Sequence, residues 1–95
     1  MSSREVEDAL STHDGIDMVA VVGIPDPYWG EAICAVVVRT DPDLHADAVI
    51  AHARARISPF KRPRHVLFIE ELPLTSNGKI AKEQIRAFAR ERIAL

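Results

Sequence analysis

The amino-acid sequence predicts one small α+β domain, with a three-stranded sheet flanked by helices in the order α-β-β-α-β-α. The segments 18–24, 31–39 and 65–69 are apolar, rich in β-branched residues and of strand length. Segments with apolar residues at helical spacing precede the first strand, separate the second from the third, and follow the third. The 95 residues suffice for a single domain over residues 1–95, and they contain no internal repeat.

Capping and turn residues define the first helix and the hairpin after it. Ser2 and Glu5 have the spacing of a capping box, and Asp14-Gly15 is typical of a helix end. The first strand is apolar on both faces, which is typical of a buried strand. Residues 25–30 contain two prolines and a glycine, so we expect a loop there. A connection this short favours antiparallel pairing of the two strands that it joins.

The second half of the chain is predicted as helix, strand and helix. The second helix begins at Asp43 or His45 and ends at Ser58-Pro59, since proline disfavours the helical conformation in the residue before it. The spacing of its apolar residues predicts one buried stripe, made of Ala46, Val49, Ile50, Ala53 and Ile57. The final helix, over 81–92, is expected to bury Ala81, Ile85, Phe88 and Ala89 and to expose Lys82, Glu83, Arg86, Arg90 and Glu91.

Composition and charge limit the class of function. The net charge is −2, so the chain has no overall positive field for a nucleic acid. No apolar run approaches the roughly 20 residues of a membrane span, and no apolar segment of a signal peptide follows Met1. Cys34 has no second cysteine to pair with and lies in an apolar run, which predicts a buried, inert thiol. The four histidines lack metal-ligand spacing, so we expect no metal site, and the whole pattern is consistent with a cytoplasmic protein.

Lys79 is the residue whose surroundings most favour a chemical role. Pro73 fixes the backbone ahead of it, Asn77-Gly78 is a turn in which glycine is free to take a positive φ, and a helix follows directly. A lysine between a tight turn and a helix start can extend its ammonium group outward, where it suits phosphate or carboxylate chemistry. By spacing alone, a turn with a solvated lysine explains the same residues.

A resemblance to a known family favours the chemical interpretation. The order Leu-Pro-x-Thr-x-x-Gly-Lys-Ile over 72–80, followed by a charged helix, resembles the C-terminal signature of the adenylate-forming enzymes. These are acyl-CoA synthetases, firefly luciferases and the adenylation domains of non-ribosomal peptide synthetases. Three upstream segments resemble the family in the same order, namely Arg4-Glu5-Val6-Glu7, the hairpin from Val21 to Glu31 with Trp29-Gly30-Glu31, and Phe60-Lys61-Arg62-Pro63. The resemblance covers nearly the whole chain, from Arg4 to about Arg90.

The resemblance implies the small C-terminal domain of an acyl-CoA synthetase. Such an enzyme activates a carboxylic acid with ATP to an acyl-adenylate, releases pyrophosphate, and transfers the acyl group to CoA. The small domain swings between two orientations on a large N-terminal domain, and the lysine that matches Lys79 enters the active site for adenylation. Gly78 would let the backbone approach closely. The acid pocket and the phosphate loop belong to the large domain, so we expect this chain alone to be inactive, with Mg²⁺ carried by the ATP phosphates and not by this chain.

The same resemblance implies a CoA site near the third strand. Phe60, Arg62 and Arg64 alternate along an extended segment and can share one face, where arginine can bind phosphate and an aromatic ring can stack on a base. Trp29, beside Gly30, is expected to face the pantetheine tunnel or the partner domain. The structural alternatives are a solvated basic loop with Phe60 in the core, and a Trp29 that only caps the hairpin.

Two other functions are compatible with the sequence. An adenylation domain that loads a carrier protein would also contain Asn77-Gly78-Lys79, although the basic residues near Arg62 favour free CoA with its several phosphates. A stand-alone module that binds a nucleotide or RNA could use residues 54–64, which hold five basic side chains and no acidic one. The identity of the carboxylic acid lies beyond this sequence, because the acyl pocket belongs to the large domain.

Overall fold

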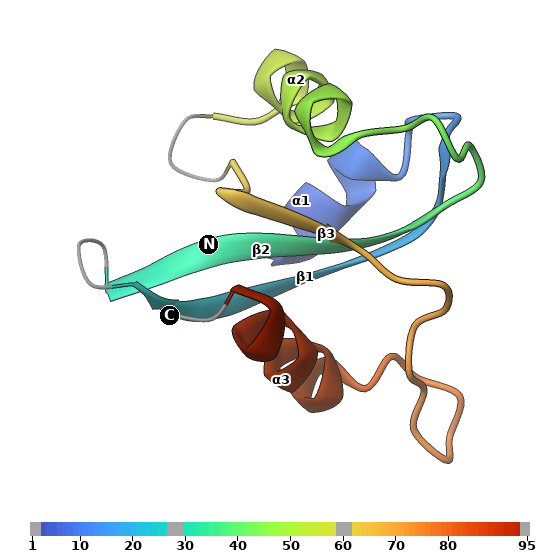
Figure 1. Cartoon of the computed structure of the whole chain (residues 1–95), viewed down its shortest axis with the longest axis vertical. Coiled ribbons are helices and arrows are strands. Elements are labelled where there is room, and N and C mark those ends of the chain that lie inside the picture. Colours follow the sequence, from blue (N-terminus) through green and yellow to red (C-terminus); the bar gives the residue numbers. More distant parts are fainter. Residues whose placement is uncertain (1–2, 27–29, 59–61, 94–95) are drawn as a thin grey trace.

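The computed structural model describes residues 3–26, 30–58 and 62–93 and has the predicted α+β architecture. The elements follow the predicted order α-β-β-α-β-α (Figure 1). Their bounds are α1 Ser3–Leu10, β1 Ile16–Asp26, β2 Gly30–Arg39, α2 Ala46–Arg56, β3 His65–Phe68 and α3 Lys82–Ile93.

The three strands form one mixed sheet with β2 in the centre. β1 pairs with β2 antiparallel, with Val21 opposite Ala35, as the short connection predicted. β3 pairs with β2 parallel, with Val36 opposite Leu67. A parallel neighbour requires a crossover connection, and α2 lies within it.

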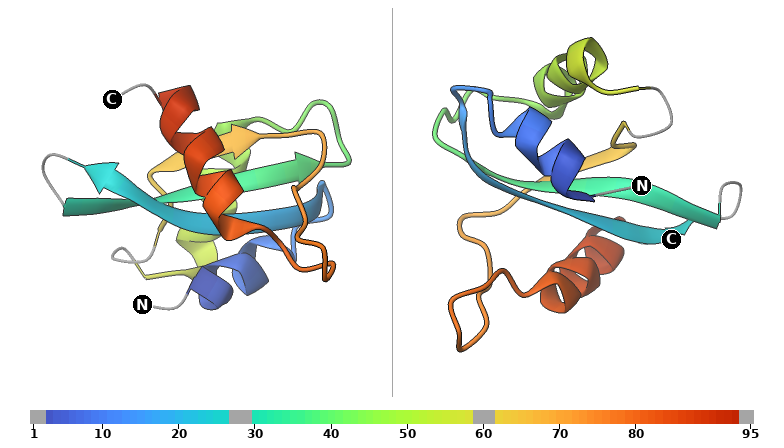
Figure 2. Two further views of the ribbon diagram at one scale, coloured as in Figure 1. Left: turned by 90° about the horizontal axis from the view of Figure 1, so that it is seen from below. Right: turned by 180° about the vertical axis from the view of Figure 1, so that it is seen from behind.

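Helices cover both faces of this sheet, α1 and α2 on one side and α3 on the other (Figures 1 and 2). Successive residues of β1 and β2 point to opposite faces, so they enter two separate cores. The first core includes Val6, Leu10, Val19, Val21, Ile33, Ala35, Val37, Val49 and Ala53. The second includes Ala20, Val22, Ile24, Cys34, Val36, Leu72, Ile85 and Ala89. The prediction that the first strand is buried on both faces is therefore confirmed from Val19 to Ile24, whereas Met18 at its start is exposed.

The hairpin is longer than the sequence predicted. Pro25 pairs with Glu31 and Asp26 with Gly30, so β1 continues through two residues that were predicted as loop. Pro25 is tolerated because β1 is an edge strand, where a missing N–H breaks no ladder. Gly30 has φ +77°, a conformation that favours glycine.

The buried stripe of α2 is narrower than predicted. Val49 and Ala53 are fully buried and Ile57 is 6% exposed, but Ala46 and Ile50 are only half-buried. Ile50 lies about 100° around the helix from Val49, which turns it away from the sheet toward a surface pocket. The prediction of Ile50 as a core residue is therefore wrong.

The final helix contains two further departures from prediction. Ala81, Ile85 and Ala89 are buried as predicted, whereas Phe88 is half-buried. Lys82, predicted as exposed, is half-buried and forms an ion pair with Glu7. Sequence spacing placed it on the solvent side of its own helix, but the edge of β1 and α1 approach it there.

Two isoleucines provide a matched test of the core. Ile85→Ala removes a fully buried side chain from the second core and should lower the free energy of unfolding by about 2–5 kcal/mol. Ile50→Ala removes the same atoms from a half-buried site and should cost about 1 kcal/mol. Urea unfolding of the two variants measures both values. Equal losses would contradict the register of α2 described above.

Two histidines join the end of α1 to α2. The rings of His13 and His52 have centroids 4.9 Å apart in an edge-to-face arrangement. Thr12 Oγ1 lies 2.8 Å from Nε2 of His52, and the Thr12 hydroxyl donates to the carbonyl of Ala9 at 2.7 Å. Because that hydroxyl has only one hydrogen, its oxygen must accept in the contact with His52. A neutral His52 should therefore be protonated at Nε2 and donate to Thr12 Oγ1.

The pKa of His52 is lowered from its ordinary value of 6.5. Burial is the largest cause, followed by the positive charge of Arg56 and by His13, while a hydrogen bond to the backbone of Ala9 acts in the opposite direction. The unfolded chain therefore binds this proton at a higher pH than the folded chain. The corresponding stability is complete above about pH 6.5 and is lost as the pH falls toward the lower folded pKa.

Replacing His52 should therefore change the pH dependence of stability. The urea midpoint of the parent chain should fall between pH 7.5 and pH 5.5, and His52→Gln should reduce that fall because it removes the titrating group. His45→Gln, which alters an exposed histidine ahead of the same helix, is the control and should leave the fall unchanged. An identical pH profile in His52→Gln and parent would contradict the expected linkage.

Candidate functional site

Lys79 lies on a small loop that is closed by its own backbone. Leu74 and Ile80 form an antiparallel bridge at the base of this loop, which we call the Lys79 loop, residues 74–80. The N–H of Thr75 donates to the carbonyl of Lys79 at 2.7 Å, and the N–H of Gly78 donates to the carbonyl of Thr75 at 2.9 Å. Thr75 Oγ1 accepts the N–H of Lys79 at 3.2 Å. Gly78 has φ +80°, which confirms the predicted turn.

The Lys79 loop projects from the domain on a buried base. Leu72 and Ala81 are buried on either side of it, and the N–H of Ala81 donates to the carbonyl of Pro73 at 2.9 Å. Residues 74–79 are exposed, and in both views of Figure 2 the loop extends beyond the start of α3. The fold thus places the ammonium group of Lys79 where another surface can reach it.

The predicted CoA segment forms part of a pocket between α2 and the start of β3. Its volume is about 290 Å³, and it is lined by Ile50, Arg54, Arg62, Pro63 and Arg64. The backbone N–H of Arg64 donates to the carbonyl of Ile33 at 2.8 Å, which ties this segment to the sheet. Three arginines facing one pocket favour an anionic ligand.

The three arginines are held differently. Arg62 is half-buried, with its Nε donating to the carbonyl of Ile57 at 3.1 Å and its Nη2 to that of Arg54 at 3.2 Å. A cation at the C-terminal end of a helix is favoured by the helix dipole, so Arg62 also stabilises the end of α2. Arg64 and Arg54 are exposed. Arg54 was not singled out from the sequence, and its only signal there was the run of basic residues without an acid.

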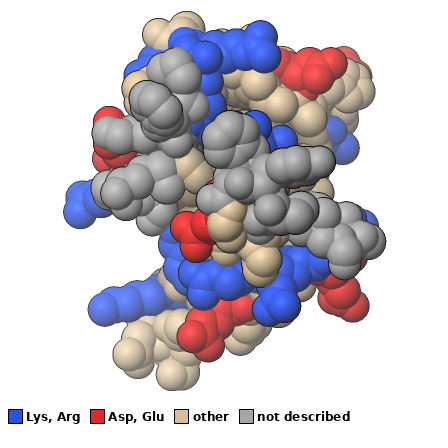
Figure 3. Space-filling view, turned by 90° about the vertical axis from the view of Figure 1, so that its left-hand side faces the viewer, with Lys and Arg blue, Asp and Glu red and all other residues tan. Residues whose placement is uncertain are grey.

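Trp29 and Phe60 lie outside the described residues. In the sequence, Trp29 comes directly before Gly30, which begins β2, and Phe60 comes two residues before Arg62, which lines the basic pocket. In Figure 3, Lys and Arg side chains gather near the top of the view and again below its middle. The predicted roles of Trp29 and Phe60 stay predictions.

The Lys79 loop and the basic pocket are far apart. In Figures 1 and 2 the loop extends beyond the start of α3, and α2 lies on the opposite face of the sheet from α3. The basic pocket is lined by residues of α2 and of the segment before β3. The structure therefore does not bring Lys79 together with Arg62 and Arg64. If both sites act on one reacting molecule, they must do so in different orientations of this domain.

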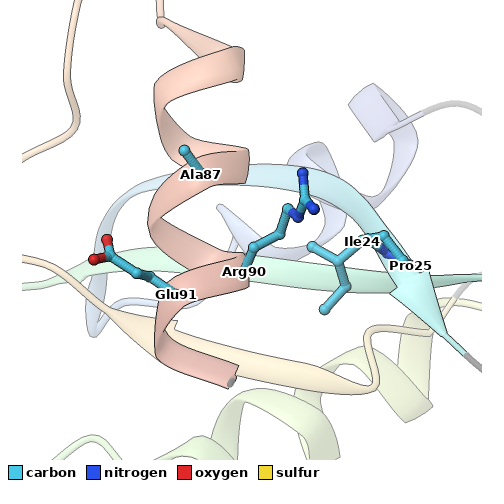
Figure 4. A pocket seen from close by; sticks show the side chains of 5 residues that line it. All are labelled: Ile24, Pro25, Ala87, Arg90 and Glu91. Carbon is cyan, nitrogen blue, oxygen red and sulfur yellow. The ribbon is translucent and has the colours of Figure 1, made fainter. Parts of the chain in front are cut away.

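A larger hollow lies between the end of β1 and α3. It has a volume of about 600 Å³ and is lined by Ile24, Pro25, Ala87, Arg90 and Glu91. Figure 4 shows the Arg90 side chain extending toward Ile24 and Pro25, while Glu91 points away. Sequence spacing identified Arg90 only as a solvent-facing helix residue, because the pairing that extends β1 past Pro25 was not predicted.

Other kinds of site find little support in the described part of the chain. Burial raises the pKa of the Cys34 thiol to about 11, so this confirmed buried cysteine is a poor nucleophile at neutral pH. Among the described residues, no three His, Cys, Asp or Glu side chains are grouped so that they could hold a metal ion. No described helix is long and apolar enough to cross a membrane. The cytoplasmic location stays a prediction.

Known CoA ligases are similar to this chain over nearly its whole length. It is 42% identical over 91 residues to the peroxisomal trans-cinnamate:CoA ligase of Petunia hybrida, which covers 95% of this chain and 16% of that protein. It is 40% identical over 90 residues to a long-chain-fatty-acid–CoA ligase of Salmonella typhimurium, again over 95% of this chain and 16% of the relative. The chain thus spans about a sixth of the length of these curated relatives.

Solved structures agree in fold. An amide bond synthetase of Marinactinospora thermotolerans matches 93% of this chain and 18% of its own, with 38% identity and a TM-score of 0.88. A fatty acyl CoA synthetase of Mycobacterium tuberculosis matches 93% of this chain and 18% of its own, with 31% identity and a TM-score of 0.86. The family model of the AMP-binding enzyme C-terminal domain matches residues 5–79. The resemblance read from the sequence is therefore confirmed, and the chain belongs to the family of AMP-binding enzyme C-terminal domains.

Proposed function

We propose that this chain is the small domain of an AMP-forming acid–CoA ligase and works with a large N-terminal domain, in the same chain or a separate one. The enzyme would join a carboxylic acid to ATP as an acyl-adenylate, release pyrophosphate, and then transfer the acyl group to CoA. The similarity to CoA ligases, of which this chain spans only a sixth, supports both the reaction and the need for a second domain.

The single observation that carries this proposal is the separation of the Lys79 loop from the basic pocket. A two-step ligase needs a cation beside the reacting phosphate in the first step and anion contacts for CoA in the second. One domain can supply both to the same centre if it rotates between the steps. Lys79 would then lie at that centre in the first step and the basic pocket in the second.

Lys79 would act in the first step. Attack of the carboxylate on the α-phosphorus of ATP places negative charge on phosphoryl oxygens and expels pyrophosphate, so a positioned cation lowers the barrier. The exposed lysine on its closed loop is suited to enter another domain's cleft, and Gly78 leaves space beside it, since a Cβ there would meet no atom within 4 Å. Mg²⁺ would come with the ATP phosphates, and most contacts to ATP would belong to the large domain.

The first test of this proposal is Lys79→Ala in the complete enzyme. Loss of the cation should slow acyl-adenylate formation by about 10²–10³-fold, the usual effect of losing one electrostatic donor. Thioester formation from supplied acyl-adenylate should change far less, because Lys79 has left the centre by then. Pyrophosphate exchange measures the first step, and release of acyl-CoA measures the second.

Ser76→Ala, an exposed change in the same loop that keeps the cation, is the control and should leave both steps near normal. An equal loss of both steps in Lys79→Ala would refute the assignment.

The basic pocket would act in the second step. Arg64 and Arg62 were expected to bind CoA phosphates, and the structure adds Arg54 to the same pocket. Guanidinium groups with no carboxylate among the described lining residues fit a phosphate-rich ligand. We include Phe60 as a stacking surface for the base and Trp29 as a wall for pantetheine. Because one similar structure is an amide bond synthetase, the family alone does not fix the acceptor, and this pocket is what favours CoA over an amine or a carrier protein.

The second test is Arg64→Ala in the complete enzyme. Removing one charge-assisted phosphate contact should raise the KM for CoA by about tenfold while pyrophosphate exchange stays normal. The increase should be smaller with dephospho-CoA if Arg64 binds the ribose phosphate.

Arg56→Ala, which alters an exposed arginine of α2 that is not among the lining residues, is the control and should leave the KM unchanged. An unchanged KM for CoA in Arg64→Ala would contradict a CoA site and would mean that this segment is only a solvated basic surface.

A further inference from the structure

Lys82 connects three segments that are distant in sequence. Its ammonium group forms an ion pair with the carboxylate of Glu7 in α1 and donates to the carbonyl of Val21 in β1 at 2.9 Å. The same Glu7 oxygen accepts the N–H of Val21 at 2.8 Å. Figure 1 shows α1 and α3 on opposite faces of the sheet. The contact of Lys82 with Glu7 and Val21 therefore joins the two outer layers at the edge of β1.

The local sequence gives no reason for a lysine at this position. Lys82 is the first residue of α3, where the helix dipole disfavours a positive charge. Its side chain is 36% exposed and that of Glu7 is 20% exposed, so both charges are partly desolvated and each depends on its partner. The placement of Lys82 is therefore explained by the contact across the edge of β1.

The contact lies close to the Lys79 loop. Lys82 is three residues after Lys79, and its N–H donates to the carbonyl of Ile80 at 3.1 Å, at the base of the loop. The other anchors of that base include the buried Leu72 and Ala81 and the half-buried Ile80. Apolar contacts hold the base against the sheet but fix its direction weakly. The ion pair and the two hydrogen bonds to the backbone of Val21 are directional. They fix where α3 begins relative to β1.

We propose that Lys82, held by Glu7 and the backbone of Val21, is a positioning residue that aims Lys79 during adenylation. This inference rests on the proposed role of Lys79. Lys82 does not touch the reacting atoms; it sets the direction of the loop that carries the cation. A displacement of about 1 Å at a reacting group can cost roughly 10²-fold in rate, so loss of this anchor should be visible in the first step.

The experiment is Lys82→Met in the complete enzyme, which keeps an apolar stem and removes the charge. Pyrophosphate exchange should slow by about 10-fold or more, whereas thioester formation from supplied acyl-adenylate should stay within about twofold. Lys82→Arg should restore most of the exchange, since a guanidinium can donate to both the carboxylate and the carbonyl. Glu7→Gln keeps an acceptor for the N–H of Val21 and removes the charge. It should therefore slow pyrophosphate exchange by a smaller factor than Lys82→Met does.

Arg86→Met is the matched control. Arg86 Nε donates to the carbonyl of Gly23 at 3.1 Å, so it also joins α3 to the edge of β1, but one turn further from Lys79. Its loss should lower stability as Lys82→Met does and leave the ratio of the two half-reactions unchanged. An equal and specific loss of exchange in both variants, or normal exchange in both Lys82→Met and Glu7→Gln, would overturn the proposal.

The two proposals fail in different ways. If Lys79→Ala impairs both half-reactions equally, the role of Lys79 is refuted whatever Lys82 does. If Lys79→Ala is specific for adenylation and Lys82→Met is not, only the positioning role is refuted.

Discussion

The central constraint on this molecule is that β2 is apolar on both faces. Residues 32–38 are buried without exception, so each face of the sheet must be covered by helices. With only 95 residues, the chain covers one face with α1 and α2 and the other with α3. The basic pocket forms where α2 meets the start of β3, and the Lys79 loop forms where the chain turns into α3. Their separation follows from burying one strand on two sides.

A three-stranded sheet leaves the outer edge of β1 without a neighbouring strand. Polar side chains from α1 and α3 form hydrogen bonds with backbone groups at that edge. Glu7 and Lys82 bind the backbone of Val21, and Arg86 binds the carbonyl of Gly23. Pro25, further along the strand, has no N–H to offer. These contacts blunt the edge against pairing with another chain. They also connect α1 and α3, which lie on opposite faces of the sheet, to the same strand.

Local patterns in the sequence were sufficient for the fold and for the Gly78 turn. The order of elements, the antiparallel hairpin and the burial of Cys34 follow from periodicity, chain connection and apolar context, which act over a few residues. What could not be predicted depends on tertiary contact. Lys82 looked solvated because helical spacing takes no account of an approaching strand edge and α1. Ile50 looked buried because its spacing fits, but it lies about 100° around the helix from Val49 and faces a surface pocket. Arg54 joins Arg62 and Arg64 only through the packing of α2 on β3.

The same contacts bear on how such a domain would move. α1 is the first element described and Glu7 belongs to it, while Lys79 lies near the other end of the chain. In the proposed enzyme, a rotation of the domain that moves α1 would be carried to the start of α3 through the link from Glu7 to Lys82. If the Lys79 loop were flexible, Lys79 could reach the acyl-adenylate centre without a rotation of the domain. Adenylation and thioester formation would then no longer be separated by the orientation of the domain. In the proposed enzyme, the link between α1 and α3 would therefore couple the position of Lys79 to the orientation of the whole domain.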